Sequence, residues 1–244
     1  MRTPFVPEAV SPRIAVVDFG MGNLHSVTQA CAQAGLDAAV TTSPEAVVSA
    51  DAVVLPGVGA FGDAMAALKA RGLDDALRHV AASGTPLVGI CLGMQLLMTE
   101  SREFGRFQGL DIVTGEVVWL EPGVVAGRAQ KVPQVNWNQL HRFGSAGADT
   151  WAGTVLDGLP DGVSMYFLHS LYVRPADPRV VIATTGYGTT EFCSALQCGN
   201  VFACQCHPER SGSAGLEVYR NLARRLHRAR ARKEDVPHAG TASQ

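Results

Sequence analysis

The sequence predicts an α/β fold with a central, mostly parallel sheet flanked by helices and with additional antiparallel strands in its C-terminal half. In the first half, short apolar segments alternate with segments of helical periodicity, as in right-handed βαβ units. Glycine-containing turns follow several of these apolar segments. Beyond about residue 112, short apolar segments separated by Gly, Pro and Asn indicate antiparallel pairing.

The first half of the chain supplies the parallel strands. Buried strands are predicted at residues 13–19, 37–42 and 52–55, and another ends at Cys91. Between the first two, apolar residues at helical spacing predict a helix with a buried face formed by Leu24, Val27, Cys31 and Ala34. Helical segments from Gly62 to Ala82 lead to the strand that ends at Cys91. Ligands of such sheets bind at the carboxyl ends of the strands, where Pro56–Gly59 and Cys91 both lie.

The second half supplies shorter strands and a last helix. Strands are predicted at residues 113–120, 131–137, 163–168, 180–187, 190–197 and 201–205, and a helix at 211–231. One domain is therefore expected over 13–231, between a flexible leader at 1–12 and a flexible tail at 232–244. Arginines crowd the end of the helix and could indicate an anion site, but a solvated helix end is the favoured interpretation: Arg224, Arg225, Arg228, Arg230 and Arg232.

Composition excludes several classes of protein. The 244 residues fit one domain with a sizeable core. The 20 basic and 22 acidic residues give a net charge of −2, which does not favour nucleic acid or an acidic membrane as partner. The chain shows neither a signal-peptide pattern nor an apolar segment long enough to span a bilayer, so a cytoplasmic protein is expected.

Cys91 lies on a glycine-flanked turn between an apolar strand and a helix-like segment. This is the arrangement of a nucleophile elbow, in which backbone N–H groups can lower a thiol pKa and hold an oxyanion. A small buried core cysteine fits the same stretch equally well. The choice depends on a base supplied from elsewhere.

A candidate base follows the last predicted strand. His207-Pro208-Glu209 ends the apolar segment that starts at Val201. In an extended segment, residues two apart point the same way, so His207 and Glu209 can project together. They would complete a Cys-His-Glu triad with Cys91. A surface His and Glu after a strand is the simpler alternative, weighted lower because the elbow and the Pro-Gly-Val-Gly loop are both present.

Together these motifs resemble the class I, triad-type glutamine amidotransferases. The resemblance rests on Gly-Ile-Cys-Leu-Gly-Met-Gln at 89–95 and on the distant His-Pro-Glu. Further motifs resemble the branch that supplies ammonia for imidazole glycerol phosphate in histidine biosynthesis: Asp18–Leu24, Leu55–Met65, Val132-Pro133 with Trp137-Asn138, Tyr166–Ser170 and His207–Ser211. The similarity runs from about Ile14 to Leu226 and implies a flavodoxin-like fold.

The resemblance implies that the protein hydrolyses glutamine to glutamate and ammonia without a cofactor or metal. Cys91 would attack the carboxamide, His207 would accept the thiol proton and pass it to the departing ammonia, and Glu209 would orient His207. Two backbone donors would hold the oxyanion, namely the N–H of Leu92 and one from the Val58-Gly59 peptide. Glutamine itself would be held by Gln95 and Ser170.

The resemblance also implies a partner, a separate (βα)8-barrel synthase subunit that receives the ammonia and forms a heterodimer with this chain. The barrel subunit would make imidazole glycerol phosphate and an aminoimidazole carboxamide ribotide. Asn136, Trp137, Asn138 and Arg210 are the candidate interface residues, because they lie in or beside motifs at the mouth of the site. A core position is an equally weighted alternative for Trp137.

Three positions depart from the family pattern. Asn136 replaces a usual Gly, Leu171 replaces a common Tyr, and Cys206 replaces a usual Phe. In the C-terminal hairpin, a turn at Gly199-Asn200 would pair Cys193 with Cys206, and a turn one residue earlier would pair it with Cys204. Either register predicts that these three thiols share one face, opposite His207, as core cysteines rather than metal ligands.

The same motifs leave three alternative functions to be weighed. A glutaminase could serve anthranilate, guanylate or pyridoxal phosphate synthesis, but the Pro-Gly-Val-Gly-Ala-Phe-Gly-Asp and Tyr-Phe-Leu-His-Ser motifs argue against this. A silent module that only activates a partner conflicts with the intact Cys91, His207 and Glu209. A cysteine peptidase of similar fold would leave Gln95 and the Pro-Gly-Val-Gly loop unexplained.

Overall fold

The predicted architecture is confirmed. A computed structural model describes residues 11–144 and 149–234, so most of the expected leader and tail lies outside the described residues. The sheet is parallel through five neighbouring strands in the order β2 (Asp37–Thr41), β1 (Arg13–Val17), β3 (Ala52–Gly57), β4 (Leu87–Cys91) and β15 (Val201–Cys204). This order places the ends of β3, β4 and β15 side by side, where the predicted site residues lie.

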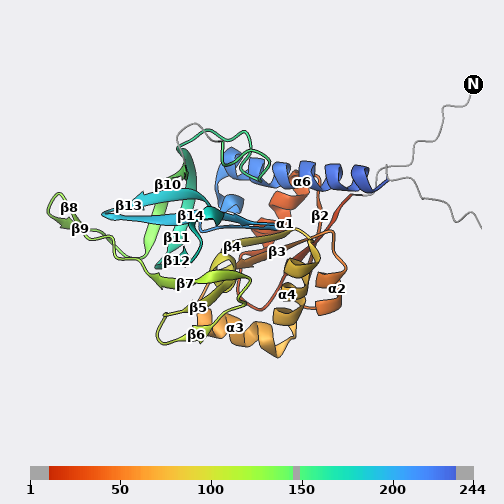
Figure 1. The fold of residues 1–244 in the computed structure, drawn as a ribbon, viewed down its shortest axis with the longest axis horizontal. Coiled ribbons are helices and arrows are strands. Elements are labelled where there is room, and N and C mark those ends of the chain that lie inside the picture. The colour runs from red at the N-terminus through yellow and green to blue at the C-terminus, as the bar shows by residue number, and fades with distance from the viewer. Residues whose placement is uncertain (1–10, 145–148, 235–244) are drawn as a thin grey trace, which may run out of the picture.

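Beyond β15 the sheet becomes mixed. It continues through β14 (Thr190–Cys198), β12 (Leu171–Pro175), β7 (Val113–Trp119), β5 (Met98–Ser101) and β6 (Phe107–Gln108), in which only the β5–β7 pair is parallel. A branch consists of β10 (Gln134–Arg142), β11 (Val163–His169) and β13 (Val181–Tyr187). A separate hairpin, β8 (Val124–Val125) with β9 (Arg128–Ala129), projects from this end of the molecule (Figure 1).

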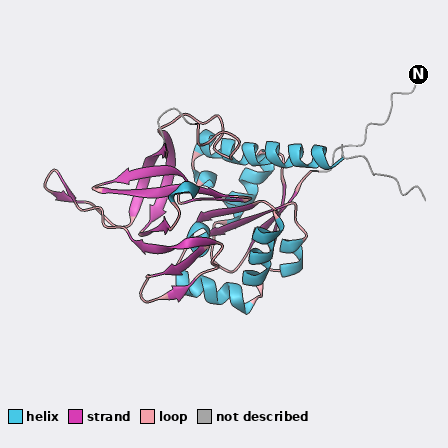
Figure 2. Cartoon of the chain, viewed as in Figure 1, coloured by secondary structure: helices cyan, strands magenta, loops and turns pink. Residues whose placement is uncertain are grey.

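Helices cover both faces of the parallel strands, while strands dominate the opposite end of the molecule (Figure 2). On one face lie α1 (Leu24–Gln33) and α6 (Gly212–Glu234). On the other lie α2 (Pro44–Val48), α3 (Phe61–Ala70), α4 (Leu73–Ser83) and α5 (Leu92–Leu96). Successive side chains of a strand point to opposite faces, so Ile14 and Val16 pack under α1 whereas Ala15 and Val17 pack under the other layer. Short 3₁₀ helices span Pro178–Val180 and Pro208–Arg210.

The cysteine hairpin follows the Gly199-Asn200 register, because Cys198 pairs with Val201 and Ala195 with Cys204. The prediction of one shared cysteine face is wrong. Cys193 packs in the core under α3 and α4, whereas Cys204 and Cys206 pack in the core under α1 and α6. The cause is an irregularity at Ser194, where β13 pairs Ala183 and Thr184 with Ala195 and Cys193, so one extra residue in β14 reverses the facing.

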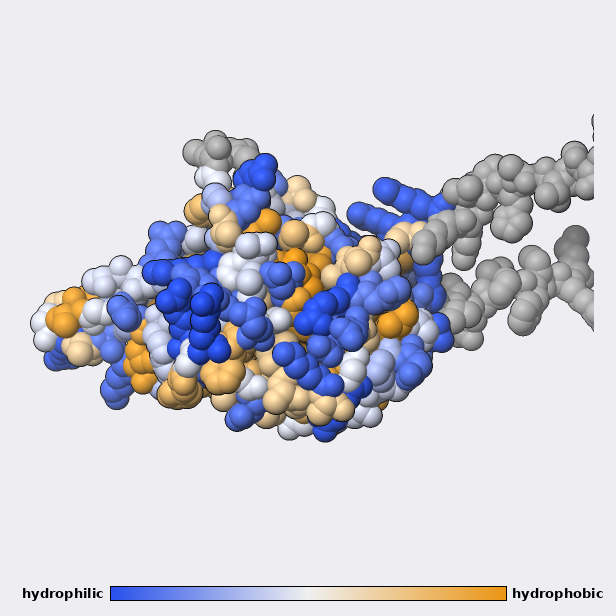
Figure 3. Space-filling view, turned by 60° about the horizontal axis from the view of Figure 1, so that its bottom comes forward, coloured by the Kyte–Doolittle hydropathy of each residue, from blue (hydrophilic) through white to orange (hydrophobic). Residues whose placement is uncertain are grey.

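All six cysteines are free thiols. Across residues 11–144 and 149–234, we find no cluster of His, Cys, Asp and Glu side chains that could hold a metal ion. No helix in these same ranges is long and apolar enough to cross a membrane. The surface instead interleaves hydrophilic and hydrophobic residues, and hydrophobic residues are visible on the projecting β8–β9 hairpin (Figure 3).

Candidate active site

Cys91 is the last residue of β4 and immediately precedes α5. Its backbone angles, φ 55° and ψ −110°, are unusual for a residue with a side chain. The turn also depends on Gly93, since a Cβ there would lie 1.7 Å from the Leu55 carbonyl oxygen of the neighbouring strand. The tight approach of α5 to β3 therefore holds Cys91 in a strained conformation at the end of its strand, as a nucleophile elbow requires.

His207 follows β15, which pairs in parallel with β4, so its imidazole lies beside the end of the strand that carries Cys91. The His207 N–H donates to the Tyr166 carbonyl (2.8 Å), and the Ser211 hydroxyl donates to the His207 carbonyl (2.6 Å). The imidazole Nδ1 lies 2.8 Å from Glu209 Oε1, and both side chains are buried. These contacts fix the ring and its tautomer.

The chain after His207 does not remain extended, as had been expected, but forms the 3₁₀ helix Pro208–Arg210. The hydrogen bond from the Arg210 N–H to the His207 carbonyl (3.0 Å) closes this turn. The pairing of His207 with Glu209 thus arises from a tight turn rather than from strand alternation. The residues predicted as partners are in contact, although the backbone that brings them together differs.

The electrostatics of His207 reflect its two neighbours. Burial alone would lower the pKa of the imidazole, but the charges of Cys91 and Glu209 and the hydrogen bond to Glu209 outweigh burial and raise this pKa to about 11. The Cys91 thiol itself lies 3.7 Å from the Leu168 carbonyl oxygen, and His207 Nε2 has no hydrogen-bond partner among the described residues. A pKa this high favours the protonated imidazole, so His207 is suited to take up a proton from the neighbouring thiol and to hold it beside Cys91.

A pocket of about 280 Å³ opens over Cys91. Every residue predicted to bind glutamine lines it, namely Val58, Gly59, Leu92, Gln95 and Ser170. Gly59 has a φ of 119°, a conformation that L side chains rarely adopt, and a Cβ there would lie 3.1 Å from Met21 Sδ. The structure thus brings the Pro-Gly-Val-Gly loop, the elbow and the Tyr-Phe-Leu-His-Ser motif together around one cavity.

A buried amide relay leads from the pocket wall to the thiol. Gln95 Nε2 donates to the Leu171 carbonyl (3.1 Å) and to Gln205 Oε1 (3.2 Å), and Gln205 Nε2 lies 3.5 Å from Cys91 Sγ. Gln205 was not predicted as a site residue, although it lies only two residues before His207. Leu171 enters the relay through its carbonyl oxygen, so the change from Tyr to Leu at this position leaves the contact intact.

Glu103 is another pocket residue that the sequence did not indicate. Its Oε2 accepts a hydrogen bond from the Phe61 N–H (2.5 Å), at the start of α3, and its side chain is buried. A carboxylate at a helix N-terminus is stabilised by the unpaired backbone N–H groups there. The pocket consequently has a fixed carboxylate in its wall.

His169 lines the pocket between the rings of Phe167 and Phe192, and its Nδ1 lies 2.9 Å from the Leu171 carbonyl oxygen. Burial lowers the pKa of this imidazole from its ordinary 6.5 to about 4. With a pKa of about 4, His169 is neutral at physiological pH, and its single ring proton lies on Nδ1, which donates to the Leu171 carbonyl. Its neutrality keeps a second positive charge away from His207.

The low pKa of His169 predicts that the unfolding free energy of the protein falls in acid. Between pH 6.5 and 4 the unfolded chain binds the His169 proton and the folded chain does not, so its contribution to stability is present above pH 6.5 and is lost as the pH falls toward 4. From pH 7 to pH 5, wild type should lose about 2 kcal/mol more unfolding free energy than His169→Phe. Urea unfolding at both pH values measures this, and His207 titrates in both proteins and cancels. Equal losses would contradict the assignment.

The predicted interface residues lie on or beside the β10–β11 pair. Trp137 is 55% exposed, so the core alternative for this residue is wrong. Its ring packs edge-on against Tyr166, over which the Arg210 guanidinium lies at 4.5 Å, and Tyr166 in turn contacts the His207 ring. Asn136 is also exposed and accepts from Gln134 Nε2, while Asn138 donates to the Gly186 carbonyl.

Comparison with known proteins agrees with this geometry. The family model for glutamine amidotransferase class-I matches residues 15–226. A solved glutamine amidotransferase superposes with a TM-score of 0.65 at 18% identity, covering 88% of this chain and 98% of that one. PurLQS from Thermotoga maritima also superposes with a TM-score of 0.65 at 18% identity, covering 89% and 100%. The chain therefore belongs to the class I glutamine amidotransferases.

Curated relatives narrow the family further. Imidazole glycerol phosphate synthase subunit HisH of Moorella thermoacetica is 45% identical over 229 residues, covering 94% of this chain and 98% of that protein. The same subunit of Syntrophotalea carbinolica is 48% identical over 212 residues, covering 86% and 98%. Within its class, this enzyme subunit belongs to the HisH family of imidazole glycerol phosphate synthase, as its motifs had indicated.

Proposed function

We propose that this protein hydrolyses glutamine through Cys91, His207 and Glu209 and delivers the ammonia to a separate (βα)8-barrel synthase subunit in histidine biosynthesis. The observation that carries the proposal is a cysteine on a strained elbow, beside a buried His-Glu pair, under a pocket of amino-acid size. His207 takes the thiol proton, Cys91 attacks the carboxamide carbon, and the imidazolium protonates the departing ammonia. Water then releases glutamate from the thioester.

Other pocket residues would hold the oxyanion and bind the amino-acid end of glutamine. The Leu92 N–H and an N–H of the Val58-Gly59 peptide are the proposed oxyanion donors, because both segments line the cavity next to Cys91. Glutamine has an ammonium group, and the buried Glu103 carboxylate is the pocket group of matching charge. Ser170 completes the wall for the amino-acid end, while Gln95 acts through the relay that reaches the thiol.

The barrel subunit would dock around the mouth of the pocket. Val132, Val135 and Trp137 are all exposed apolar residues, at 42%, 52% and 55%, and Pro133 between them lines the pocket. Exposed apolar residues grouped in this way are typical of protein interfaces. Arg210, stacked on Tyr166, lies on the same side of the triad and would contribute a polar contact at the rim.

Mixing the protein with the barrel subunit and its nucleotide ligand should strongly stimulate glutamate release. The physical reason is that, in the isolated chain, the Cys91 thiol lies against the Leu168 carbonyl and not in a hydrogen bond with His207 Nε2. Docking of the barrel subunit can therefore favour a rearrangement that brings the thiol and the imidazole together. Glutamate is measured by coupled oxidation, with Trp137→Ala expected to weaken stimulation and exposed Val40→Ala, on β2, expected to preserve it. Release that stays at background, with Cys91→Ala indistinguishable from wild type, would favour the silent module.

A further inference from the structure

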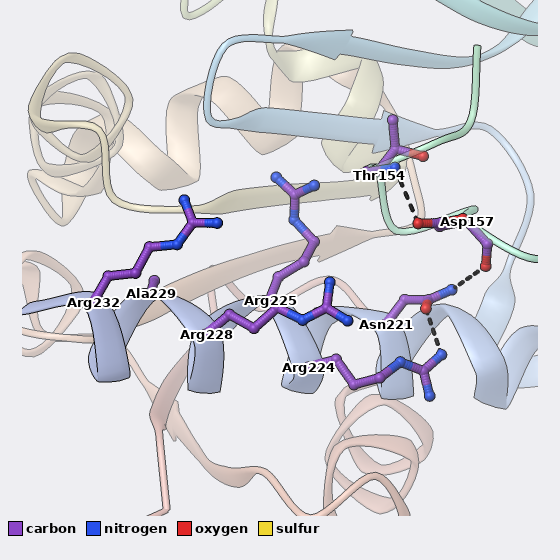
Figure 4. Close-up of a pocket in the computed structure, with 9 residues that line it drawn as sticks. Thr154, Asp157, Asn221, Arg224, Arg225, Arg228, Ala229 and Arg232 are labelled. Carbon is purple, nitrogen blue, oxygen red and sulfur yellow. Dashed lines mark hydrogen bonds between the residues drawn. The ribbon is translucent and has the colours of Figure 1, made fainter. Parts of the chain in front are cut away.

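A hollow of about 520 Å³ lies between α6 and the loop of residues 153–157 and shares no lining residue with the glutamine pocket. Four arginines of α6 line it, namely Arg224, Arg225, Arg228 and Arg232, and Asp157 is the single carboxylate among the described lining residues (Figure 4). The lining is therefore strongly positive, although the whole chain has a net charge of −2. The mechanism of glutamine hydrolysis uses none of these groups.

The arginines of this hollow differ from the other arginines in their pairing. Nine arginines in the described part of the chain form ion pairs with carboxylates. Arg224 is one of them, since it contacts Glu217 and also the Asn221 side chain. For Arg225, Arg228 and Arg232, no ion pair is found within residues 11–144 and 149–234. Three guanidinium groups thus share one hollow with no ion pair among the described residues and with Asp157 as the carboxylate nearest to them.

Their spacing places these three groups in a row. Positions three and four apart lie on the same side of a helix, so Arg225, Arg228 and Arg232 follow one another along α6. Figure 4 shows the side chains of Arg225 and Arg232 rising from the same side of the helix. The negative end of the helix dipole acts over the last turn only, and Arg225 and Arg228 lie before that turn of a helix that ends at Glu234.

The opposite wall is polar and fixed. The Asp157 carboxylate accepts from the Gly153 N–H (3.0 Å), and Asn221 Nδ2 donates to the Val155 and Asp157 carbonyls. Partial burial lowers the pKa of the Arg225 guanidinium, which the nearby Asp157 carboxylate only partly offsets. An anion in the hollow would supply the counter-charge that Asp157 alone does not provide.

We propose that this hollow binds a small anion carrying two or more phosphate groups. Guanidinium groups bind phosphate oxygens bidentately, and a row of three can engage successive phosphates. The concave shape, closed by the 153–157 loop, fits a compact ligand better than an extended nucleic-acid strand. The chemistry is shared by inorganic oligophosphates and by the phosphates of a nucleotide, and the proposal is independent of the glutaminase activity.

Calorimetric titration of the full-length protein with inorganic tripolyphosphate and, separately, with ATP tests the site. One saturable site is expected, and tighter binding of ATP than of tripolyphosphate would identify a nucleotide as the ligand, while equal or weaker binding would identify inorganic oligophosphate. Arg225→Gln with Arg228→Gln should weaken binding by about a hundredfold, roughly tenfold for each lost charge-assisted contact. Arg220→Gln is the matched control, because Arg220 pairs with Glu217 on the same helix outside the hollow.

A variant that is expected to bind more tightly separates loss of the binding site from loss of the fold, because a misfolded protein would not gain affinity. Asp157→Asn keeps an acceptor for the Gly153 N–H but removes the only negative charge of the lining, so it should bind tripolyphosphate several-fold more tightly. The proposal is overturned if no saturable binding occurs at millimolar tripolyphosphate, if Arg220→Gln weakens binding as much as the double variant, or if Asp157→Asn leaves affinity unchanged. Tighter binding of single-stranded RNA than of either phosphate ligand, lost in the double variant, would equally overturn it in favour of a nucleic-acid surface.

Discussion

Cys91→Ala is expected to abolish glutamate release from glutamine while sparing synthesis from added ammonium salts by the complex with the barrel subunit. Without the thiol no thioester can form, and general acid–base groups alone cannot replace a nucleophile in this pocket. The remaining rate of glutamate release should lie at or near the detection limit of the glutamate assay. Alanine is smaller than cysteine and fits the elbow, whose geometry depends on the contact of Gly93 with Leu55, so the fold should persist.

The matched control is Cys198→Ala, because this cysteine is the only partly exposed one in the chain and lies in the C-terminal hairpin at its turn. It should retain wild-type rates with both glutamine and ammonium. Two outcomes would contradict the assignment. If Cys91→Ala lost both activities, Cys91 would be structural; if it kept glutamine use, another nucleophile would be at work.

Glu209→Gln is expected to lower kcat for glutamine by roughly four orders of magnitude, as the change of a triad carboxylate to an amide does elsewhere. The carboxylate raises the pKa of His207, and its removal therefore lowers that pKa toward the ordinary value. Because the thiolate–imidazolium pair is lost when His207 deprotonates, the alkaline limb of the pH–rate profile should move to lower pH.

The profile of kcat/KM against pH measures this shift. Glu217→Gln is the control, because Glu217 is a carboxylate that pairs with Arg224 on α6 and does not line the pocket over Cys91. Glu217→Gln should show the alkaline limb of the kcat/KM profile at the same pH as wild type. A reduced kcat with an unmoved alkaline limb would mean that Glu209 supports the fold of the turn rather than the charge of His207.

Local patterns allowed the elements around the triad to be predicted. The strands that end at Gly57, Cys91 and Cys204 are continuous apolar segments, which is the pattern of strands buried on both faces. Glycines mark both close approaches of the backbone, at Gly93 and in the Val58-Gly59 loop. Since parallel neighbours place their carboxyl ends together, the pocket followed from the order of the motifs.

Other parts of the site depend on contacts that no local pattern encodes. Glu103 reaches the Phe61 N–H across 42 positions of sequence, and Gln95 meets Gln205 across 110. Both contacts join segments that are far apart in the sequence and meet only in the folded chain. The prediction of the sheet face on which Cys193 lies was wrong for a related reason. One extra residue at Ser194 reverses the alternation of side chains along β14, and the pattern of apolar residues does not reveal it.

The exposure of Trp137 likewise could not be predicted from its residue type, because tryptophan is common both in cores and at interfaces. On β10 it faces Tyr166 of the paired strand, and the two rings with Arg210 form a surface layer over His207. This arrangement connects the proposed docking surface directly to His207, the proposed catalytic base. A partner that contacts Trp137 would therefore be one aromatic ring away from His207.

The role of Cys91 as the nucleophile is tested most directly by labelling the complex with an electrophilic glutamine analogue, such as its chloroketone, and locating the adduct by peptide mass spectrometry. We predict one adduct per chain, on Cys91, formed in step with the loss of glutamate release and prevented by excess glutamine. Inactivation with Cys91 unmodified and the adduct on another cysteine would contradict it.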